Sequence, residues 1–224
     1  SLQRLGRWPW SRARIAQLVR ELTGRQQAAV LGLDALFAEP EAGLSGPASG
    51  GDPAPDDELA RALAGAPVVL GYYFSSERDA RRTGQLPAPL AGQTPWPRLL
   101  HWSGYGANLP ALATVAPAAG FFNAVTDSDG VVRRVPLVAG FDGALYESMA
   151  LSMLRLGLHP APLRIRPVEP QAEGDRALTL ATPNGPLALM MSAQGTVQVP
   201  FRGAGGPHGG SFRYVSAAAV LAGQ

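Results

Sequence analysis

Near the N-terminus, a segment with apolar residues at helical spacing is followed by a segment that is almost entirely apolar. Ile15, Leu18, Val19 and Leu22 recur at the i, i+3, i+4 and i+7 positions of residues 11–22. This spacing predicts an amphipathic helix with Ser11 as its N-cap. The run AAVLGLDALF that follows, residues 28–37, contains a single charged residue, Asp34, and predicts a buried strand.

A second helix and strand follow a segment rich in Gly and Pro. Residues 40–58 contain eight Gly or Pro among nineteen residues, which predicts a mobile loop. Residues 56–65 predict a short helix that Asp56 or Asp57 would cap, and the apolar run 67–74 predicts a second buried strand. The order helix, strand, loop, helix, strand favours α/β layers with parallel strand pairing.

The C-terminal half predicts more strands than helices. Residues 120–126 and 131–140 are expected as strands on either side of a turn, and residues 146–157 as a helix. Further strands are expected in 178–182, 187–191 and 196–201, the first two joined by an Asn-Gly turn, with a short helix from Ser216 onward. The fold class is therefore α/β, with a mixed β-sheet flanked by helices and a β-rich C-terminal part. We expect one domain over residues 1–224, with a possible boundary near residue 160, where residues 159–175 have the composition of a linker.

Composition narrows the possible chemistry. The 224 residues are 46% hydrophobic, which suits a globular chain, and 19 basic against 17 acidic residues leave a net charge of +2. No run of basic residues exceeds two, so we expect no nucleic-acid partner. The chain has no Lys and no Cys, which excludes Schiff-base, P-loop and thiolate chemistry. The three histidines lie far apart, and we expect neither a metal nor a cofactor.

The longest charge-free segment does not have the composition of a membrane helix. Residues 99–126 lack Asp, Glu, Arg and Lys, but prolines, glycines and asparagines interrupt them. We expect this segment to be buried loop and strand. Any membrane anchor is expected outside these residues.

The sequence NAVTDSDGVVRRVPL, residues 123–137, places two aspartates, a glycine and two arginines within apolar sequence. As a calcium loop beginning at Asp127 it lacks oxygen ligands after position 3. As a catalytic pair, Asp127 and Asp129 are two residues apart on a turn and do not face each other across a substrate. A tight turn with Gly130 at positive φ is the favoured interpretation.

The two arginines that follow the turn, Arg133 and Arg134, are consecutive, so on a strand they face opposite sides of the sheet. We expect one of them to point inward, where it would need a carboxylate or an anionic ligand. Asp34 is the expected partner. A structural ion pair is favoured over a ligand anchor, although Arg133 stays a candidate for ligand binding.

A second candidate pocket is the aromatic segment 94–110, TPWPRLLHWSGYGANLP. Trp96, Trp102 and Tyr105 could pack over the edge of the sheet, which is the favoured interpretation. They could also line a pocket with Arg98 and His101 as polar anchors.

Taken together, several segments resemble the CHASE type 2 domain, the second class of cyclase- and histidine-kinase-associated sensory extracellular domains. The segments are WPWSRARIAQLV, LGLDALFAEP, DDELARAL, VVLGYYF, GFFNAVTDSDGVVRRVPL, LYESMALSML and VPFRG followed by FRYVSAAAVLAG. The resemblance spans nearly the whole chain and marks the following residues as a structural motif: Asp34, Asn123, Asp127, Asp129, Gly130, Arg133, Pro136 and Ser148.

The resemblance implies a non-catalytic, extracytoplasmic (periplasmic) input domain of a bacterial membrane-bound signalling protein. Flanking transmembrane helices would pass a signal from an unidentified small-molecule or environmental ligand to a cytoplasmic cyclase, kinase or cyclic-di-GMP enzyme, within a homodimer. Two alternatives stay open: a protein-interaction or dimerisation module, and a periplasmic hydrolase that uses Asp127 and Asp129.

Overall fold

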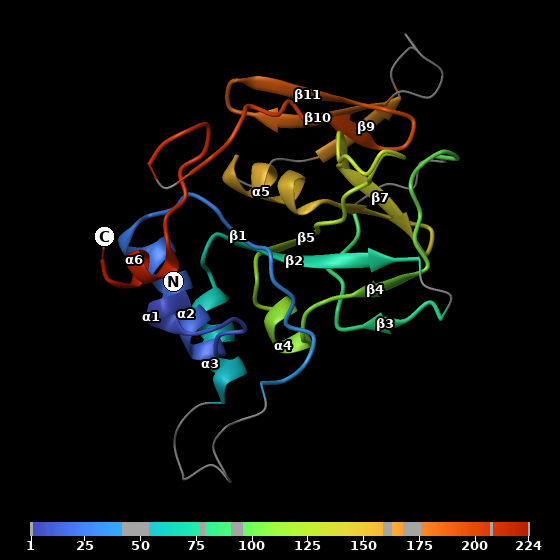
Figure 1. Ribbon diagram of the computed structural model, residues 1–224. Helices are drawn as coiled ribbons and strands as arrows, with labels where there is room; N and C mark the ends of the chain where they lie inside the picture. The colour runs from blue at the N-terminus through green and yellow to red at the C-terminus, as the bar shows by residue number, and fades with distance from the viewer. Residues whose placement is uncertain are drawn as a thin grey trace.

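The computed structural model describes residues 2–41, 54–76, 79–90, 96–158, 163–167, 176–206 and 208–223 (Figure 1). The helices are α1 (Leu2–Leu5), α2 (Arg12–Arg20), the π-helical turn Glu21–Arg25, α3 (Pro55–Leu63), α4 (Pro110–Ala113), α5 (Met149–Gly157) and α6 (Ala217–Leu221). The first strands are β1 (Leu31–Leu33), β2 (Val68–Ser75), β3 (Arg82–Thr83), β4 (Gly104–Gly106), β5 (Ala118–Phe121) and β6 (Arg134–Pro136). The remaining strands are β7 (Val138–Phe141), β8 (Ala144–Glu147), β9 (Leu163–Pro167), β10 (Arg176–Thr182), β11 (Gly185–Met191) and β12 (Thr196–Gln198). The predicted α/β class with a mixed sheet is confirmed.

The longest strand of the main sheet is β2, and its neighbours change along its length. Its first half pairs in parallel with β1 on one edge and with β5 on the other. Its last three residues pair antiparallel with β4, which in turn pairs in parallel with β3. The parallel β1–β2 pairing that the sequence predicted is therefore correct.

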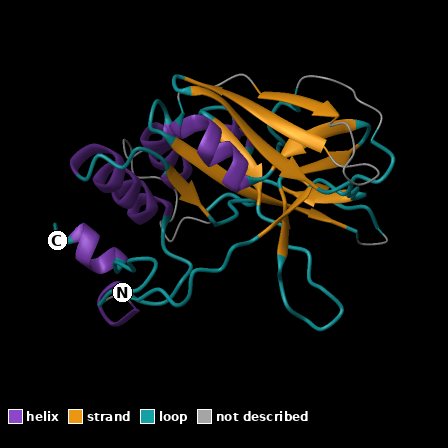
Figure 2. Ribbon diagram, turned by 90° about the horizontal axis from the view of Figure 1, so that it is seen from above, coloured by secondary structure: helices purple, strands orange, loops and turns teal. Residues whose placement is uncertain are grey.

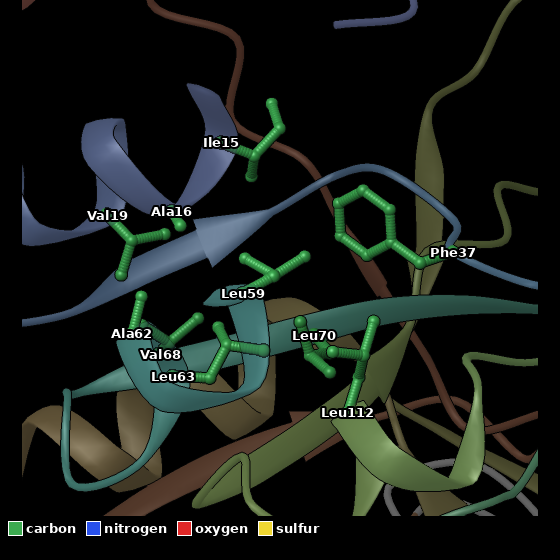
Figure 3. Close-up of a cluster of buried hydrophobic side chains, with 10 residues drawn as sticks. All are labelled: Ile15, Ala16, Val19, Phe37, Leu59, Ala62, Leu63, Val68, Leu70 and Leu112. Atoms are coloured by element: carbon green, nitrogen blue, oxygen red, sulfur yellow. The ribbon is translucent and has the colours of Figure 1, made fainter. Parts of the chain in front are cut away.

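Helices cover both faces of this sheet, and Figure 2 shows them gathered toward one end of the molecule. On one face, α2, α3 and α4 pack against β2 around Val19, Leu63, Leu70 and Leu112, all of which are fully buried (Figure 3). Full burial of each such aliphatic side chain contributes about 2 kcal/mol. On the other face α5 approaches so closely that a methyl group on Gly120 of β5 would lie 2.5 Å from the Met149 backbone.

A ring of strand pairings encloses an aromatic core. β5 pairs with β2, and its last residue, Phe121, forms a bridge with Ser148, which directly follows β8. β8 in turn pairs with β7. Gly140 of β7 bridges His101, and the same segment returns to β2 as β4. Aromatic side chains from every member fill the ring: Tyr72, Phe74, Trp102, Tyr105, Phe121, Phe141 and Tyr146. The segment that contains β4 is therefore held both by its pairing with β2 and by its bridge to β7.

Two asparagine side chains complete the hydrogen bonding of β2 where its neighbours end. Asn108, which is buried, accepts from the Phe37 N–H at 2.9 Å and donates to the Gly71 carbonyl at 2.9 Å. Asn123 accepts from the Phe74 N–H and donates to the Phe74 carbonyl, both at 2.8 Å. Each amide therefore replaces a missing strand, because buried backbone groups need partners.

Several elements have boundaries that differ from the predictions. The strand expected over 28–37 is reduced to β1, since the Phe37 N–H is bonded to Asn108 instead of a ladder partner. α3 begins with Pro55 after Ala54, and no side chain caps it. The expected cap Asp56 instead accepts from Arg12 Nε at 2.9 Å and from the Glu41 N–H at 3.0 Å. Asp56 therefore bonds to residues distant in sequence instead of capping its own helix.

The C-terminal half shows the same kind of shift. Tyr146, expected at the start of a helix, lies in β8, and α5 begins after Ser148, whose hydroxyl accepts from the Leu151 N–H. Within the expected linker 159–175, residues Leu163–Pro167 form β9, which pairs with β10. β10, β11 and the helix after Ser216 agree with the predictions, but β12 ends at Gln198 instead of residue 201. The turn between β10 and β11 lies at Pro183–Asn184, one residue before the predicted position, because Thr182 pairs with Gly185. Most of the predicted loop 40–58, namely residues 42–53, lies outside the described residues.

Replacement of Asn108 by Ala should lower the free energy of unfolding by about 3 kcal/mol. The variant leaves the Phe37 N–H and the Gly71 carbonyl without partners, and each buried unpaired group costs about 1–3 kcal/mol. Urea unfolding followed by circular dichroism measures the change. Gln17→Ala, which removes an exposed amide on α2, is the control and should change stability by less than about 0.5 kcal/mol. Equal stabilities of the two variants would contradict the assigned role of Asn108.

Candidate functional site

The turn at residues 127–131 is held by its own backbone and by Arg133. The Asp127 N–H donates to the Val131 carbonyl at 3.0 Å, and Gly130 has a φ of 82°. Arg133 donates from Nη1 to Asp127 Oδ2 at 3.0 Å and from Nη2 to Asp129 Oδ2 at 2.8 Å. These contacts confirm the prediction of a tight turn at Gly130. The strands around it are shorter than predicted, because β5 ends at Phe121 and β6 pairs with β12.

The prediction of an inward-facing arginine bonded to Asp34 is wrong. Arg133 and Arg134 are both exposed, and so is Asp34. The carboxylates that Arg133 binds precede it by only four and six residues. A partner so close in sequence costs less conformational entropy to position than Asp34, about a hundred residues away, would.

The carboxylates of the turn do not have the properties of a catalytic pair. The hydrogen bond from Arg133 holds the pKa of Asp129 below its ordinary value of 3.8. A general acid needs a raised pKa, so the shift has the opposite direction. Asp127 is bonded to the same guanidinium. This geometry favours a structural turn over the hydrolase alternative.

The aromatic segment 94–110 is divided between two packed clusters. Trp96 is buried against β10 and β11, and its Nε1 donates to the Ala193 carbonyl at 2.7 Å. Trp102 stacks on Phe74 with ring centroids 5.6 Å apart, inside the aromatic ring of strands. Arg98 is exposed. Both tryptophans are therefore packed in these clusters, whereas Tyr105 also lines a cleft.

That cleft lies at the carboxyl ends of β1 and β2, beside β4 and β3. We call it the strand-end cleft; its volume is about 270 Å³. Its walls are formed by Leu36, Ala38, Glu39, Tyr73, Ser75, Arg81, Thr83 and Tyr105. In open α/β sheets, ligands bind outside the carboxyl ends of the parallel strands. The strand-end cleft is therefore the candidate functional site.

Packing and backbone contacts position the two tyrosines of the cleft. The Tyr73 ring lies against Gly106, where an added methyl group would come within 2.5 Å of the ring. A side chain at position 106 would displace that ring. Tyr105 is fixed from below by Phe141, with ring centroids 5.3 Å apart in an edge-on arrangement.

Arg81 lines the cleft because the next residue, Arg82, projects from the opposite side of the chain. The Arg81 carbonyl accepts from the Tyr105 N–H at 2.9 Å, which fixes the backbone beside β4. The next residue, Arg82, pairs with Asp142 at 3.3 Å and lies over the Phe141 ring. Consecutive extended residues project to opposite sides, so Arg81 is left at the cleft.

A smaller cleft of about 160 Å³ lies beside the start of α5. Its charged residues are already bonded to each other, because Arg155 donates to both carboxylate oxygens of the buried Glu147, at 3.0 and 2.6 Å. This bidentate pair raises the pKa of Arg155. Nearby, burial raises the pKa of Tyr72, whose hydroxyl has no hydrogen-bond partner among the described residues. The paired charges make this cleft a poorer ligand site than the strand-end cleft.

The sequence missed most of the strand-end cleft. Glu39, Tyr73 and the pair Arg81 and Thr83 come from three separate segments that only the sheet brings together. Among the residues that the structure describes, no group of three acidic or histidine side chains could hold a metal ion. His101 and His208 lie in the described part, and His159 lies outside it. Three other residues of the structural motif have structural roles. Asn123 bonds the backbone of Phe74 in β2, Pro136 is buried in β6, and Ser148 caps α5.

Replacement of Arg133 by Ala should raise the pKa of Asp129 toward 3.8, because the hydrogen bond that lowers it is removed. Carboxyl chemical shifts followed by NMR between about pH 2 and 7 measure the titration. Arg134→Ala is the control and should leave the titration of Asp129 unchanged. The lowered pKa stabilises the fold above the ordinary carboxyl value, and this contribution is lost as pH falls through the folded-state pKa. Wild type and Arg133→Ala should therefore converge in stability in strong acid; an unshifted Asp129 in the variant would refute the ion pair.

Comparison with known proteins gives one match. The CHASE2 domain family matches residues 1–223. No curated protein and no solved structure matches the chain. In the described part of the chain, the helices are too short or too polar for a bilayer crossing. Because the match covers essentially the whole chain, this protein belongs to the CHASE2 domain family, a family of sensory extracellular domains.

Proposed function

We propose that this chain is the extracytoplasmic, periplasmic input domain of a bacterial membrane-bound signalling protein. It passes a ligand or environmental signal through flanking transmembrane helices to a cytoplasmic nucleotide cyclase, kinase or cyclic-di-GMP enzyme. The observation that carries the proposal is the family match over residues 1–223. The chain itself performs no catalysis in this proposal.

The positions of the two ends of the domain support this arrangement. α6 packs beside α2 and the π-helical turn, and the N and C labels lie close together in Figure 1. Arg25 donates to the Val220 carbonyl at 3.4 Å and to the Gly223 carbonyl at 3.3 Å. Transmembrane helices attached to these ends would therefore leave from the same side of the domain. A change at that side could move both helices together.

The mechanism is a shift between two arrangements of the domain or of a homodimer. A ligand changes their populations only through different affinities for the two arrangements. A shift from 1:99 to 99:1 requires a ratio of affinities of about 10⁴. The strand-end cleft has walls from the segment after β1 and the segment before β3, so a bound ligand would connect two parts of the chain that are far apart in sequence.

Exposed aromatic side chains favour a second candidate function, a dimerisation or protein-interaction module. Phe201, Phe212 and Tyr214 are 72%, 59% and 61% exposed on the segment before α6. If this segment forms the interface, the replacement of all three by Ser should abolish self-association, because the buried apolar area is lost. Sedimentation equilibrium measures the oligomeric state. Dimerisation that persists in the triple variant would exclude this segment as the interface.

The placement outside the cytoplasmic membrane is tested by cysteine labelling of the full-length protein in its native membrane. The 224 residues contain no Cys, so Ala150→Cys introduces a single thiol on the exposed side of α5. A membrane-impermeant maleimide should label this thiol equally in intact and in lysed spheroplasts, because the domain faces outward. The same protein without the substitution controls for thiols outside these residues. Labelling only after lysis would place the domain in the cytoplasm and overturn the proposed function.

A further inference from the structure

We propose that the strand-end cleft binds a small zwitterion of the free α-amino acid class. The inference rests on the proposed sensory function and names the ligand class of the same site. Arg81 would bind the carboxylate, Glu39 the ammonium group, and Tyr73 with Leu36 the side chain.

The first observation is a pair of opposite charges in one cleft that are not bonded to each other. Glu39 and Arg81 both line the cleft, and no ion pair joins them within the described part of the chain. The other nearby arginines are occupied: Arg12 bonds to Asp56 and Arg82 bonds to Asp142. Two charges that share a cleft without pairing can each take an opposite charge from a ligand.

The pair of charges selects the ligand class. A simple anion would meet the guanidinium favourably but would be repelled by Glu39, and a simple cation would be repelled by Arg81. A molecule with both charges satisfies both groups. The planar guanidinium binds a carboxylate through two parallel hydrogen bonds, which fixes its orientation as well as its charge.

The remaining walls suit the rest of an amino acid. The ring of Tyr73 can contact either an ammonium group through its face or an apolar side chain. Ser75 and Thr83 add hydroxyl groups that can donate or accept. The volume of about 270 Å³ lies below the range that drug-sized ligands occupy, which is roughly 300–1,000 Å³, and fits a metabolite of amino-acid size.

The position of the cleft allows binding to affect the fold. Glu39 follows β1, whereas Arg81 precedes β3 and is bonded through its carbonyl to Tyr105 of β4. A ligand held by both charges would therefore link the segment after β1 to the β3–β4 pair. Such a link is the differential contact that a population shift requires.

The test uses the 224-residue chain and the proteinogenic L-amino acids, each assayed separately by thermal shift and then by calorimetry. At least one of them should raise the melting temperature, because a ligand of the native state stabilises it. Its methyl ester lacks the free carboxylate and its N-acetyl derivative lacks the ammonium group. Each derivative should bind at least about tenfold more weakly, which corresponds to the loss of one charged contact.

Matched variants assign the two charges. Arg81→Ala and Glu39→Gln should each weaken binding by at least about tenfold. The ion pair of Arg82 and Asp142, on the other side of the same segment, supplies the controls: Arg82→Ala and Asp142→Asn should change affinity by less than about twofold. Circular dichroism checks that all four variants are folded. For a variant that does not fold, the methyl ester and the N-acetyl derivative on the wild-type chain decide the same point.

Three results would overturn the proposal. No amino acid raises the melting temperature or gives a heat of binding; acetate binds as tightly as the amino acid and independently of Glu39, which would make the cleft a simple anion site; or both cleft variants bind normally. None of these results affects the cysteine labelling, which tests the extracytoplasmic placement separately. Labelling only after lysis would overturn the proposed function even if an amino acid bound.

Discussion

The hydrogen-bonding requirement of strand β2 is the constraint on which the rest of the structure depends. β1 accompanies β2 only as far as Leu70, and β4 begins opposite Tyr73, so Gly71 would face a gap on that edge. Asn108 fills the gap by bonding the Gly71 carbonyl and the Phe37 N–H. On the opposite edge, β5 ends at Phe121, and Asn123 bonds both backbone groups of Phe74. A buried strand with unpaired groups at these places would be strongly destabilised.

The replacement of β1 by β4 along the same edge of β2 also creates the candidate site. Because β1 stops early, the chain after it leaves the sheet and places Leu36, Ala38 and Glu39 beside the end of β2. The antiparallel strand β4 then occupies the vacated edge and presents Tyr105. The cleft is thus the space left where one strand replaces another, and its floor is held by the aromatic ring of strands. Rigid packing below and segments of irregular structure above are a suitable combination for a site whose ligand changes the positions of its walls.

Interactions close in sequence were predictable, and interactions between distant segments were less so. The turn at Gly130 and the Ser11 and Ser148 caps follow from residue preferences within a few positions. The hairpin between β10 and β11 was also predictable, although its turn lies one residue before the expected Asn184–Gly185 pair. Asp56 was expected as a helix cap, but its partners are Arg12 and Glu41, which lie 44 and 15 residues away. Arg133 was expected to reach Asp34, but its own turn supplied two nearer carboxylates. A polar side chain bonded a partner within its own turn or helix where one was close in sequence. It bonded a distant residue where the fold brought a stronger partner near.

The sequence by itself determined the class of the fold, the parallel pairing of β1 and β2, and membership of a sensory domain family. These properties depend on hydrophobic periodicity and on contiguous motifs, both of which are visible along the chain. The tertiary structure alone decided the cleft, since Glu39, Tyr73, Arg81 and Tyr105 come from four segments with no common motif. It also decided that Arg81 lines the cleft while Arg82 pairs with Asp142. The alternation of an extended chain places neighbouring side chains on opposite sides, but only the packed sheet determines what each side faces.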